Sequence, residues 1–342
     1  MLARRTSLQL PNGVTIDLPR LVPAFSSKGF GRLSQGNSKK YSEVTLALEL
    51  MGPFIKFFLL SGFDLHHGLL RKPERFYRGK DLIFIDSGGY ELSPHWDSTE
   101  PVQQPYKSSN FGAHEYRKVL QKLPKTMPFV ITNYDWGSRE EPVLNQILMA
   151  QEFFNGFSFF GRNFLVKPGK KKRYLDVDEI MVHIGKLRAF HILGVTEKEL
   201  GKDIITRLLN IAKLRSAMDR ENVNVPIHIW GGLDPVISPL YFFAGAEIFD
   251  GVSWLRYAYH EGLAVYRDCY GILKVGIETP LDHVRALVLS QNITFLQQLT
   301  INLRQLVDNN FHRFDMFGTN SASLEQAYRT LCTKIPELKG GV

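Results

Sequence analysis

Seven apolar runs of strand length recur through the middle of the chain, and segments with helical patterns lie between several of them. Short apolar runs that alternate with helices, without a second apolar class, indicate parallel strands joined by crossover helices. A (β/α)8 TIM barrel is the most economical way to close such a series, so we expect this α/β fold. The runs are Ile55–Leu60, Leu82–Ile85, Phe129–Thr132, Asn163–Val166, Phe190–Leu193, Ile227–Trp230 and Glu247–Asp250.

The segments before and after this series differ from it and suggest three regions. Residues 1–40 are rich in turns, with a strong turn signal at Pro11-Asn12-Gly13, and we expect a small β element that plugs one end of the main domain. Residues 41–276 should form the catalytic barrel. Beyond them the alternation stops and apolar residues recur at helical spacing, so 277–342 should be a helical segment packed on the barrel.

Composition narrows the class of protein. The chain is 44% hydrophobic, which supplies a large core, and its 42 Lys and Arg against 34 Asp and Glu are a weak pointer to a polyanionic partner. The two cysteines, Cys269 and Cys332, fit neither a disulfide scaffold nor a cysteine zinc site. The most apolar stretch, 44–63, is interrupted by charged residues, Gly and Pro, and the N-terminus lacks a signal-peptide core. We therefore expect a cytoplasmic protein with no membrane contact.

Residues suited to catalysis follow the ends of the predicted strands, where the active sites of such barrels lie. Asp86 follows the second run and Asp250 ends the last one. Two carboxylates that face one substrate suit glycosidic chemistry, in which one is the nucleophile and the other an acid or base. A solvated aspartate in a turn would explain Asp86 alone equally well, but similar groups follow other runs. These strand ends are 86–90, 133–135, 167–169, 194–195, 231–234 and 250–251.

Two of these strand ends resemble motifs of the tRNA-guanine transglycosylase family. The stretch Asp86-Ser-Gly-Gly-Tyr90 resembles the family's DSGGYQ or DSGGFQ signature, with Glu91 in place of the glutamine. Phe249-Asp-Gly-Val252, followed by Arg256, resembles the FDCV…TR segment that carries the family's nucleophile.

Two further segments extend the resemblance. Ile192-Leu-Gly-Val195 with Glu197 is similar to the family's GGLAVGE loop, and Asn133-Tyr-Asp135 falls where the family has a base-binding aspartate. The order and spacing of all four segments hold from about Phe84 to Val307, which is about two thirds of the chain.

The resemblance implies roles for individual residues. Asp250 would attack the anomeric carbon of a nucleotide, and Asp86 would act as general acid and base. A covalent glycosyl-aspartate would form, from which an incoming base displaces the enzyme with net retention and without a cofactor. The residues that would line the base pocket are Ser87, Gly88, Gly89, Tyr90, Asp135, Lys167, Gly194 and Val195.

Departures from the family pattern point to one branch of the superfamily. The family's cysteine cluster is missing and Gln291 stands at its zinc-binding histidine, so no metal is expected. Lys167 replaces a neutral amide that reads the base, which changes the hydrogen-bonding pattern because lysine only donates. The stretch after Arg256 is also rewritten. A zinc-less relative of this kind resembles the enzymes that exchange guanine in DNA for a 7-deazaguanine such as 7-cyano-7-deazaguanine.

Under this interpretation, basic residues would supply the contacts to nucleic acid. Arg256 and the run Lys170, Lys171, Lys172 and Arg173 are expected to bind phosphates, although such a run is often just a solvated loop. The expected partners are DNA and a 7-deazaguanine base, with a second copy of the chain or an ATPase as further possibilities.

Three alternatives stay open at this stage: a transglycosylase that acts on tRNA, a non-catalytic nucleic-acid-binding subunit of a modification complex, and a hydrolase that uses the same two carboxylates with water. His191 and His228 fall within predicted strands and are expected to be satisfied core histidines, because no ligand pattern surrounds them.

Overall fold

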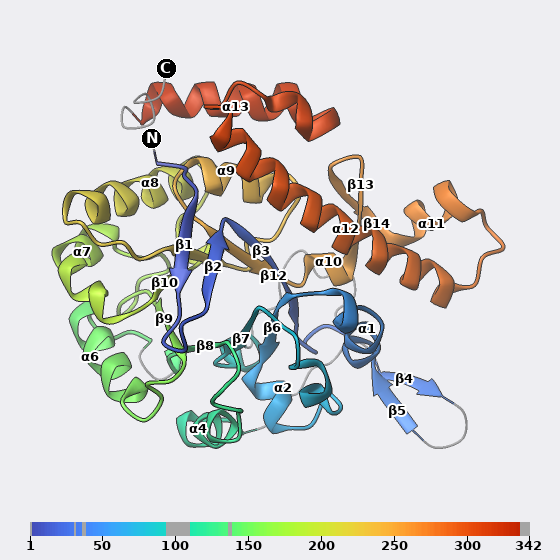
Figure 1. Cartoon of the computed structure of the whole chain (residues 1–342), viewed down its shortest axis with the longest axis horizontal. Coiled ribbons are helices and arrows are strands. Elements are labelled where there is room, and N and C mark those ends of the chain that lie inside the picture. Colours follow the sequence, from blue (N-terminus) through green and yellow to red (C-terminus); the bar gives the residue numbers. More distant parts are fainter. Residues whose placement is uncertain (1, 31, 36–38, 94–109, 136–138, 336–342) are drawn as a thin grey trace.

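A closed barrel of eight parallel strands forms the centre of the computed structural model, which describes residues 2–30, 32–35, 39–93, 110–135 and 139–335. The strands follow one another around the barrel in chain order, and the last pairs with the first. The expected α/β barrel is therefore confirmed (Figure 1). Its strands are β3 (Arg20–Phe25), β6 (Phe57–Ser61), β7 (Leu82–Asp86), β8 (Phe129–Thr132), β9 (Gly161–Val166), β10 (Ile192–Thr196), β11 (Ile227–Trp230) and β12 (Ile248–Gly251).

The first barrel strand, β3, lies outside the region that the sequence assigned to the barrel. It pairs with β12 on one side and β6 on the other, so the barrel begins at Arg20 and not at residue 41. Pro23 hides this strand in the sequence, because proline within an apolar run argues against a central strand. The barrel also closes at Gly251, and the chain beyond it forms a separate hairpin of β13 (Tyr257–His260) and β14 (Leu263–Tyr266).

The N-terminal hairpin fills the end of the barrel where the strands begin. It consists of β1 (Thr6–Gln9) and β2 (Thr15–Leu18), joined by the expected turn, in which Gly13 has a positive φ of 83°. Its buried leucines and isoleucine form one cluster with the inward side chains of the barrel, and Leu10 approaches Gly161 at the start of β9. The expected plug is confirmed, and it leaves the opposite end of the barrel for chemistry.

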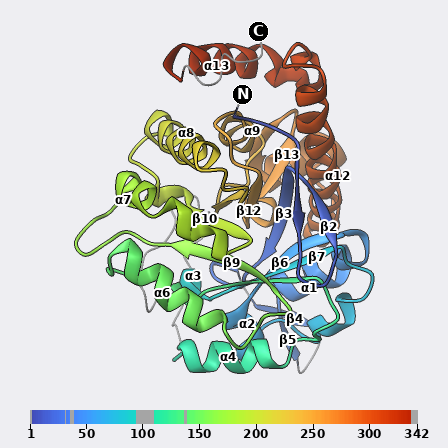
Figure 2. The same ribbon diagram turned by 60° about the vertical axis from the view of Figure 1, so that its left-hand side comes forward.

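Helices cover the outside of the barrel. Figures 1 and 2 show α4, α6, α7, α8 and α9 following one another around one side. The long C-terminal helix α12 packs beside β3, and α13 contacts α9, where the rings of Phe243 and Tyr328 lie 5.5 Å apart. The C-terminal segment is thus helical and packed on the barrel, as expected.

The helices run as follows: α1 (Glu43–Met51), α2 (Gly62–His66), α3 (Gly89–Leu92), α4 (Ala113–Gln121), α6 (Val143–Phe154), α7 (Val177–Val182), α8 (Ile204–Arg220), α9 (Ile237–Phe243), α10 (Ser253–Arg256), α11 (Arg267–Val275), α12 (Leu281–Asp308) and α13 (Ser321–Lys334). A further hairpin, β4 (Arg32–Gln35) with β5 (Lys39–Ser42), projects from the body in Figure 1.

The barrel interior changes from apolar to polar along its axis. Side chains of a strand alternate between the two faces, so inward residues recur at every second position. Phe84 and Ile248 belong to the apolar cluster above the plug, and Asp86 and Asp250, two residues further on, face the same side at the other end. Polar inward positions therefore gather at the carboxyl ends of the strands.

Replacing Leu8 by alanine tests the plug, because this side chain is 3% exposed and packs against the barrel interior. The cavity should lower the free energy of unfolding by about 2–5 kcal/mol, measured by urea denaturation. Leu263→Ala on β14, where the side chain is 51% exposed, is the control and should change it by less than about 0.5 kcal/mol. Equal stability of the two variants would mean that the hairpin does not seal the barrel.

Candidate active site

The turn after β7 fixes Asp86 at the mouth of the barrel. All five residues of β7 are buried, and the backbone N–H of Gly88 donates a hydrogen bond to Asp86 Oδ1. Gly88 has a φ of 79°, a backbone conformation that residues other than glycine rarely adopt. A Cβ there would lie 2.8 Å from Phe63 Cβ. At Gly89 a Cβ would lie 3.0 Å from Asp135 Oδ2. The two glycines therefore let Phe63 and Asp135 approach the turn.

Asp86 lies in surroundings that favour its protonated form. Burial raises the pKa of Asp86 well above its usual value, and the negative charge of Glu91 raises it further. The charges of Asp135 and Asp250 act in the same direction, whereas the hydrogen bond from Gly88 opposes them. A carboxylic acid of this kind is suited to donate a proton to a leaving group.

Two more buried acids, Glu91 and Asp64, belong to the surroundings of Asp86. Burial raises the pKa of Glu91, although the Ser26 hydroxyl donates a hydrogen bond to its Oε1. Burial and the charge of Glu91 also raise the pKa of Asp64, whose carboxylate accepts hydrogen bonds from the backbone N–H and the hydroxyl of Ser27, at 2.6 and 2.5 Å. Asp86, Glu91 and Asp64 thus form a cluster of three buried acids, called the acid cluster below.

Asp250 lies on β12 and faces hydrogen-bond donors. Its Oδ1 lies 3.0 Å from Nε2 of His228 on β11 and accepts a hydrogen bond of 3.3 Å from the backbone N–H of Gly231. The other ring nitrogen of His228 lies 2.9 Å from Nδ2 of Asn163 on β9. His228 is buried in a strand and fully paired, as expected, but one of its partners is the expected nucleophile.

Asp135 and Lys167 form a charged wall beside the acid cluster. The Ser87 hydroxyl donates a hydrogen bond to Asp135 Oδ1, and Lys167 Nζ lies 3.3 Å from Asp135 Oδ2 and 3.2 Å from Glu199 Oε2. Burial by itself lowers the pKa of Lys167, but the charges of Glu199 and Asp135 outweigh it, so the pKa rises above its usual value. Lys167 is therefore a permanent cation that also donates to the Thr196 hydroxyl at 2.9 Å.

The expected pocket residues Gly194 and Val195 lie within β10 and not after it, because this strand continues to Thr196. Gly194 faces the barrel interior, where a Cβ would lie 2.6 Å from Trp230 Nε1 and 2.7 Å from Asn163 Oδ1. Val195 faces the opposite side and packs in the apolar layer between barrel and helices. Val195 therefore does not line the pocket, which corrects the sequence-based assignment.

Arg256 contacts the protein and not the solvent. Its side chain is buried, and Nη2 donates hydrogen bonds to the Tyr90 hydroxyl at 2.8 Å and to the Lys28 carbonyl at 3.4 Å. Lys28 Nζ in turn lies 4.6 Å from the centre of the Tyr90 ring and donates to the Tyr90 carbonyl. Arg256 thus orients Tyr90, and its burial corrects the expectation that it contacts phosphate.

The basic run after β9 is exposed, as a nucleic-acid contact requires. Lys170, Lys171, Lys172 and Arg173 follow the carboxyl end of the strand and so lie on the side of the mouth. Lys172 forms an ion pair of 2.6 Å with Asp176 at the start of α7.

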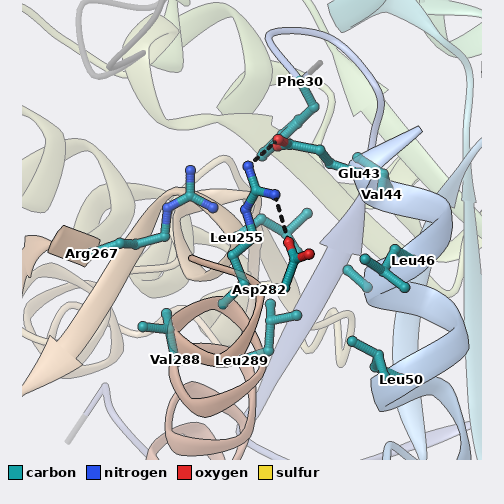
Figure 3. Close-up of a pocket in the computed structure, with 12 residues that line it drawn as sticks. Phe30, Glu43, Val44, Leu46, Leu50, Leu255, Arg267, Asp282, Val288 and Leu289 are labelled. Carbon is teal, nitrogen blue, oxygen red and sulfur yellow. Dashed lines mark hydrogen bonds and ion pairs between the residues drawn. The ribbon is translucent and has the colours of Figure 1, made fainter. Parts of the chain in front are cut away.

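Other kinds of site are not found among the described residues. No group of three or more His, Cys, Asp or Glu side chains there could hold a metal ion. No helix in the same residues is long and apolar enough to cross a membrane. Figure 3 shows a pocket between α1 and α12, with Arg267 and Asp282 in its wall, but its mostly apolar lining contains neither Asp86 nor Asp250.

Several residues of the site were not identified from the sequence. Asp64, Lys28 and Glu199 stand at ordinary positions in the chain, and only the arrangement of the strands in the barrel brings them to their partners at the mouth. His228 offered one signal, because it alternates with Trp230 on the inward face of a strand that ends at the mouth.

The chain was also compared with known proteins. No protein-family model matches it, and a search of curated proteins finds no match.

Replacing Glu91 by glutamine tests the acid cluster. Because the folded state raises the pKa of Glu91 above 4.5, the folded protein binds this proton more tightly than the unfolded chain. Its contribution to stability is fully present below about pH 4.5 and is lost as the pH rises through the folded-state pKa. Glu91→Gln should therefore be more stable than the wild type at pH 8, with a smaller difference at pH 5.

Urea denaturation at the two pH values measures this difference. Glu325→Gln on the surface of α13 is the control, and its effect should not change between them. A wild-type protein that is more stable than Glu91→Gln at pH 8 would contradict the raised pKa of Glu91 in the folded protein.

Proposed function

We propose that the protein is a transglycosylase that exchanges guanine in DNA for a 7-deazaguanine base such as 7-cyano-7-deazaguanine. The observation that carries this proposal is the presence of both Asp86 and Asp250 at the same mouth of a closed barrel. They come from strands β7 and β12, which β3 and β6 separate, and the charge of Asp250 acts on Asp86. Retaining glycosyl transfer uses two such carboxylates.

The different surroundings of the two carboxylates support different roles. In the proposed reaction an oxygen of the Asp250 carboxylate forms a bond to C1′ while the bond from C1′ to the guanine nitrogen breaks. The electron pair of that bond goes to the nitrogen, and Asp86 gives its proton to the leaving base. The incoming base then attacks C1′, Asp86 recovers a proton from it, and Asp250 leaves as a carboxylate.

The charged wall of Asp135 and Lys167, together with Ser87, supports recognition of a polar base. Asp135 accepts hydrogen bonds, and Lys167 donates them from a charged group that Glu199 and Thr196 hold in place. This pairing of one acceptor and one donor suits a base whose edge carries both an N–H and a carbonyl oxygen, such as a guanine derivative.

Access to C1′ in a duplex requires the target nucleotide to leave the stack, at a cost of a few kcal/mol. The exposed run from Lys170 to Arg173 lies on the side of the mouth, where contacts to phosphates would hold the strand. Arg256 supports the proposal differently, since it orients Tyr90 beside the pocket.

Asp250→Asn should abolish the exchange, because the amide is a poor nucleophile. We expect a loss of about 10⁴-fold or more, measured by nucleoside mass spectrometry on DNA and tRNA from cells that express the chain and receive 7-deazaguanine precursors. Asp178→Asn on the exposed face of α7 is the matched control and should keep full activity.

The two pools of nucleic acid separate the alternatives. A deazaguanine deoxynucleoside that disappears with Asp250→Asn is the expected result. If the tRNA is modified and the DNA is not, the substrate is tRNA and not DNA. Unchanged pools, with purified protein that still binds nucleic acid, would favour a non-catalytic subunit.

A further inference from the structure

A line of hydrogen-bonded side chains runs from Asp250 into the barrel, and the reaction described above does not use it. His228 Nε2 lies 3.0 Å from Asp250 Oδ1, and His228 Nδ1 lies 2.9 Å from Asn163 Nδ2. Neither His228 nor Asn163 is exposed to solvent. The three side chains of this line lie on strands β12, β11 and β9, so each is held by rigid backbone.

The partners of His228 fix where its proton lies. A carboxylate can only accept hydrogen bonds, so the ring must donate to Asp250 from Nε2. In the structure the amide nitrogen of Asn163, which can only donate, faces Nδ1, so Nδ1 accepts in this arrangement. The hydrogen of the ring therefore lies on Nε2, where it faces Asp250. Phe84 and Trp230 hold the ring in this orientation, with ring centres 5.2 and 4.5 Å from the imidazole.

The two oxygens of Asp250 differ in their contacts. Oδ1 accepts hydrogen bonds from His228 Nε2 and from the backbone N–H of Gly231. Among the described residues, none donates a hydrogen bond to Oδ2. We propose that His228 is a positioning residue that holds Oδ1, so that Oδ2 is the atom that attacks C1′. This inference rests on the function proposed above.

The arrangement serves both halves of the reaction. When Oδ2 forms the bond to C1′, Oδ1 becomes the carbonyl oxygen of the ester and keeps its two donors. When the ester breaks, the electron pair of the bond from Oδ2 to C1′ returns to the carboxylate, and the charge spreads to Oδ1. Donors already aimed at that oxygen stabilise the departing carboxylate without rearrangement.

Two substitutions of His228 separate a lost hydrogen bond from a disturbed fold. His228→Phe keeps a planar ring but removes the donor, and it should lower kcat by about 10²-fold with little change in KM. His228→Gln offers an amide N–H at a similar distance and should restore most of kcat. His191→Gln is the control, because this histidine precedes β10 at the plugged end of the barrel and should leave kcat unchanged.

Two kinetic results would overturn the inference. One is a folded His228→Phe protein with wild-type kcat. The other is a folded His228→Gln protein that is as impaired as His228→Phe, since the donor at this position would then not be what matters.

A second measurement does not depend on catalysis. In protein with ¹⁵N-labelled histidine, NMR should show a hydrogen on Nε2 of His228 and none on Nδ1, and Asp250→Ala should shift its Nε2 signal. A hydrogen on Nδ1, or no response to Asp250→Ala, would overturn the inference even if exchange occurs. A wild-type protein that shows the expected signals but exchanges no base would instead disprove the proposed function and leave the hold on Oδ1 intact.

Discussion

The burial of carboxylates at one end of a closed barrel is the constraint on which the rest of the site depends. A buried charge is costly unless it is neutralised or hydrogen-bonded, and each acid at the mouth meets this demand differently. The acid cluster favours protonation, because burial raises the pKa of all three members and the charge of Glu91 raises those of Asp86 and Asp64 further. Asp135 has a cation in Lys167 and a hydroxyl in Ser87. Asp250 has the imidazole of His228 and the N–H of Gly231.

The segment after β3 shows how much of this compensation comes from far away in the chain. Ser26 donates to Glu91, Ser27 donates to Asp64, and Lys28 donates to the carbonyl of Tyr90. The same strand is tied to the C-terminal half, because Trp254 Nε1 donates to the carbonyl of Ala24 at 3.0 Å. The pairing of β3 with β6 therefore places the donors after β3 close to the acids that follow β6 and β7, and its pairing with β12 brings Trp254 to the same strand.

Much of the fold was accessible from the sequence, since apolar strands and their alternation with helices are local signals. The ends of strands also placed Asp86, Asp135, Lys167 and Asp250 at one mouth. The failures have local causes as well: Pro23 concealed β3, and Gly194 looked like the end of a strand that continues to Thr196. Contacts between side chains of different strands could not be predicted. The contact of His228 with Asp250 depends on the register and side-chain direction of two neighbouring strands, and that of Arg256 with Tyr90 depends on closure of the barrel.

The same residue type thus has two different environments within one barrel mouth. Asp86 faces other acids, which penalise its charge and favour a bound proton. Asp250 faces two N–H groups on one oxygen, and these can only interact favourably with a lone pair. Chemistry that needs both an acid and a nucleophile would gain from this difference, because the neighbours of Asp86 penalise a negative charge and the donors on Asp250 stabilise one. The division follows from which neighbours the strands bring to each aspartate, and it exists before any substrate binds.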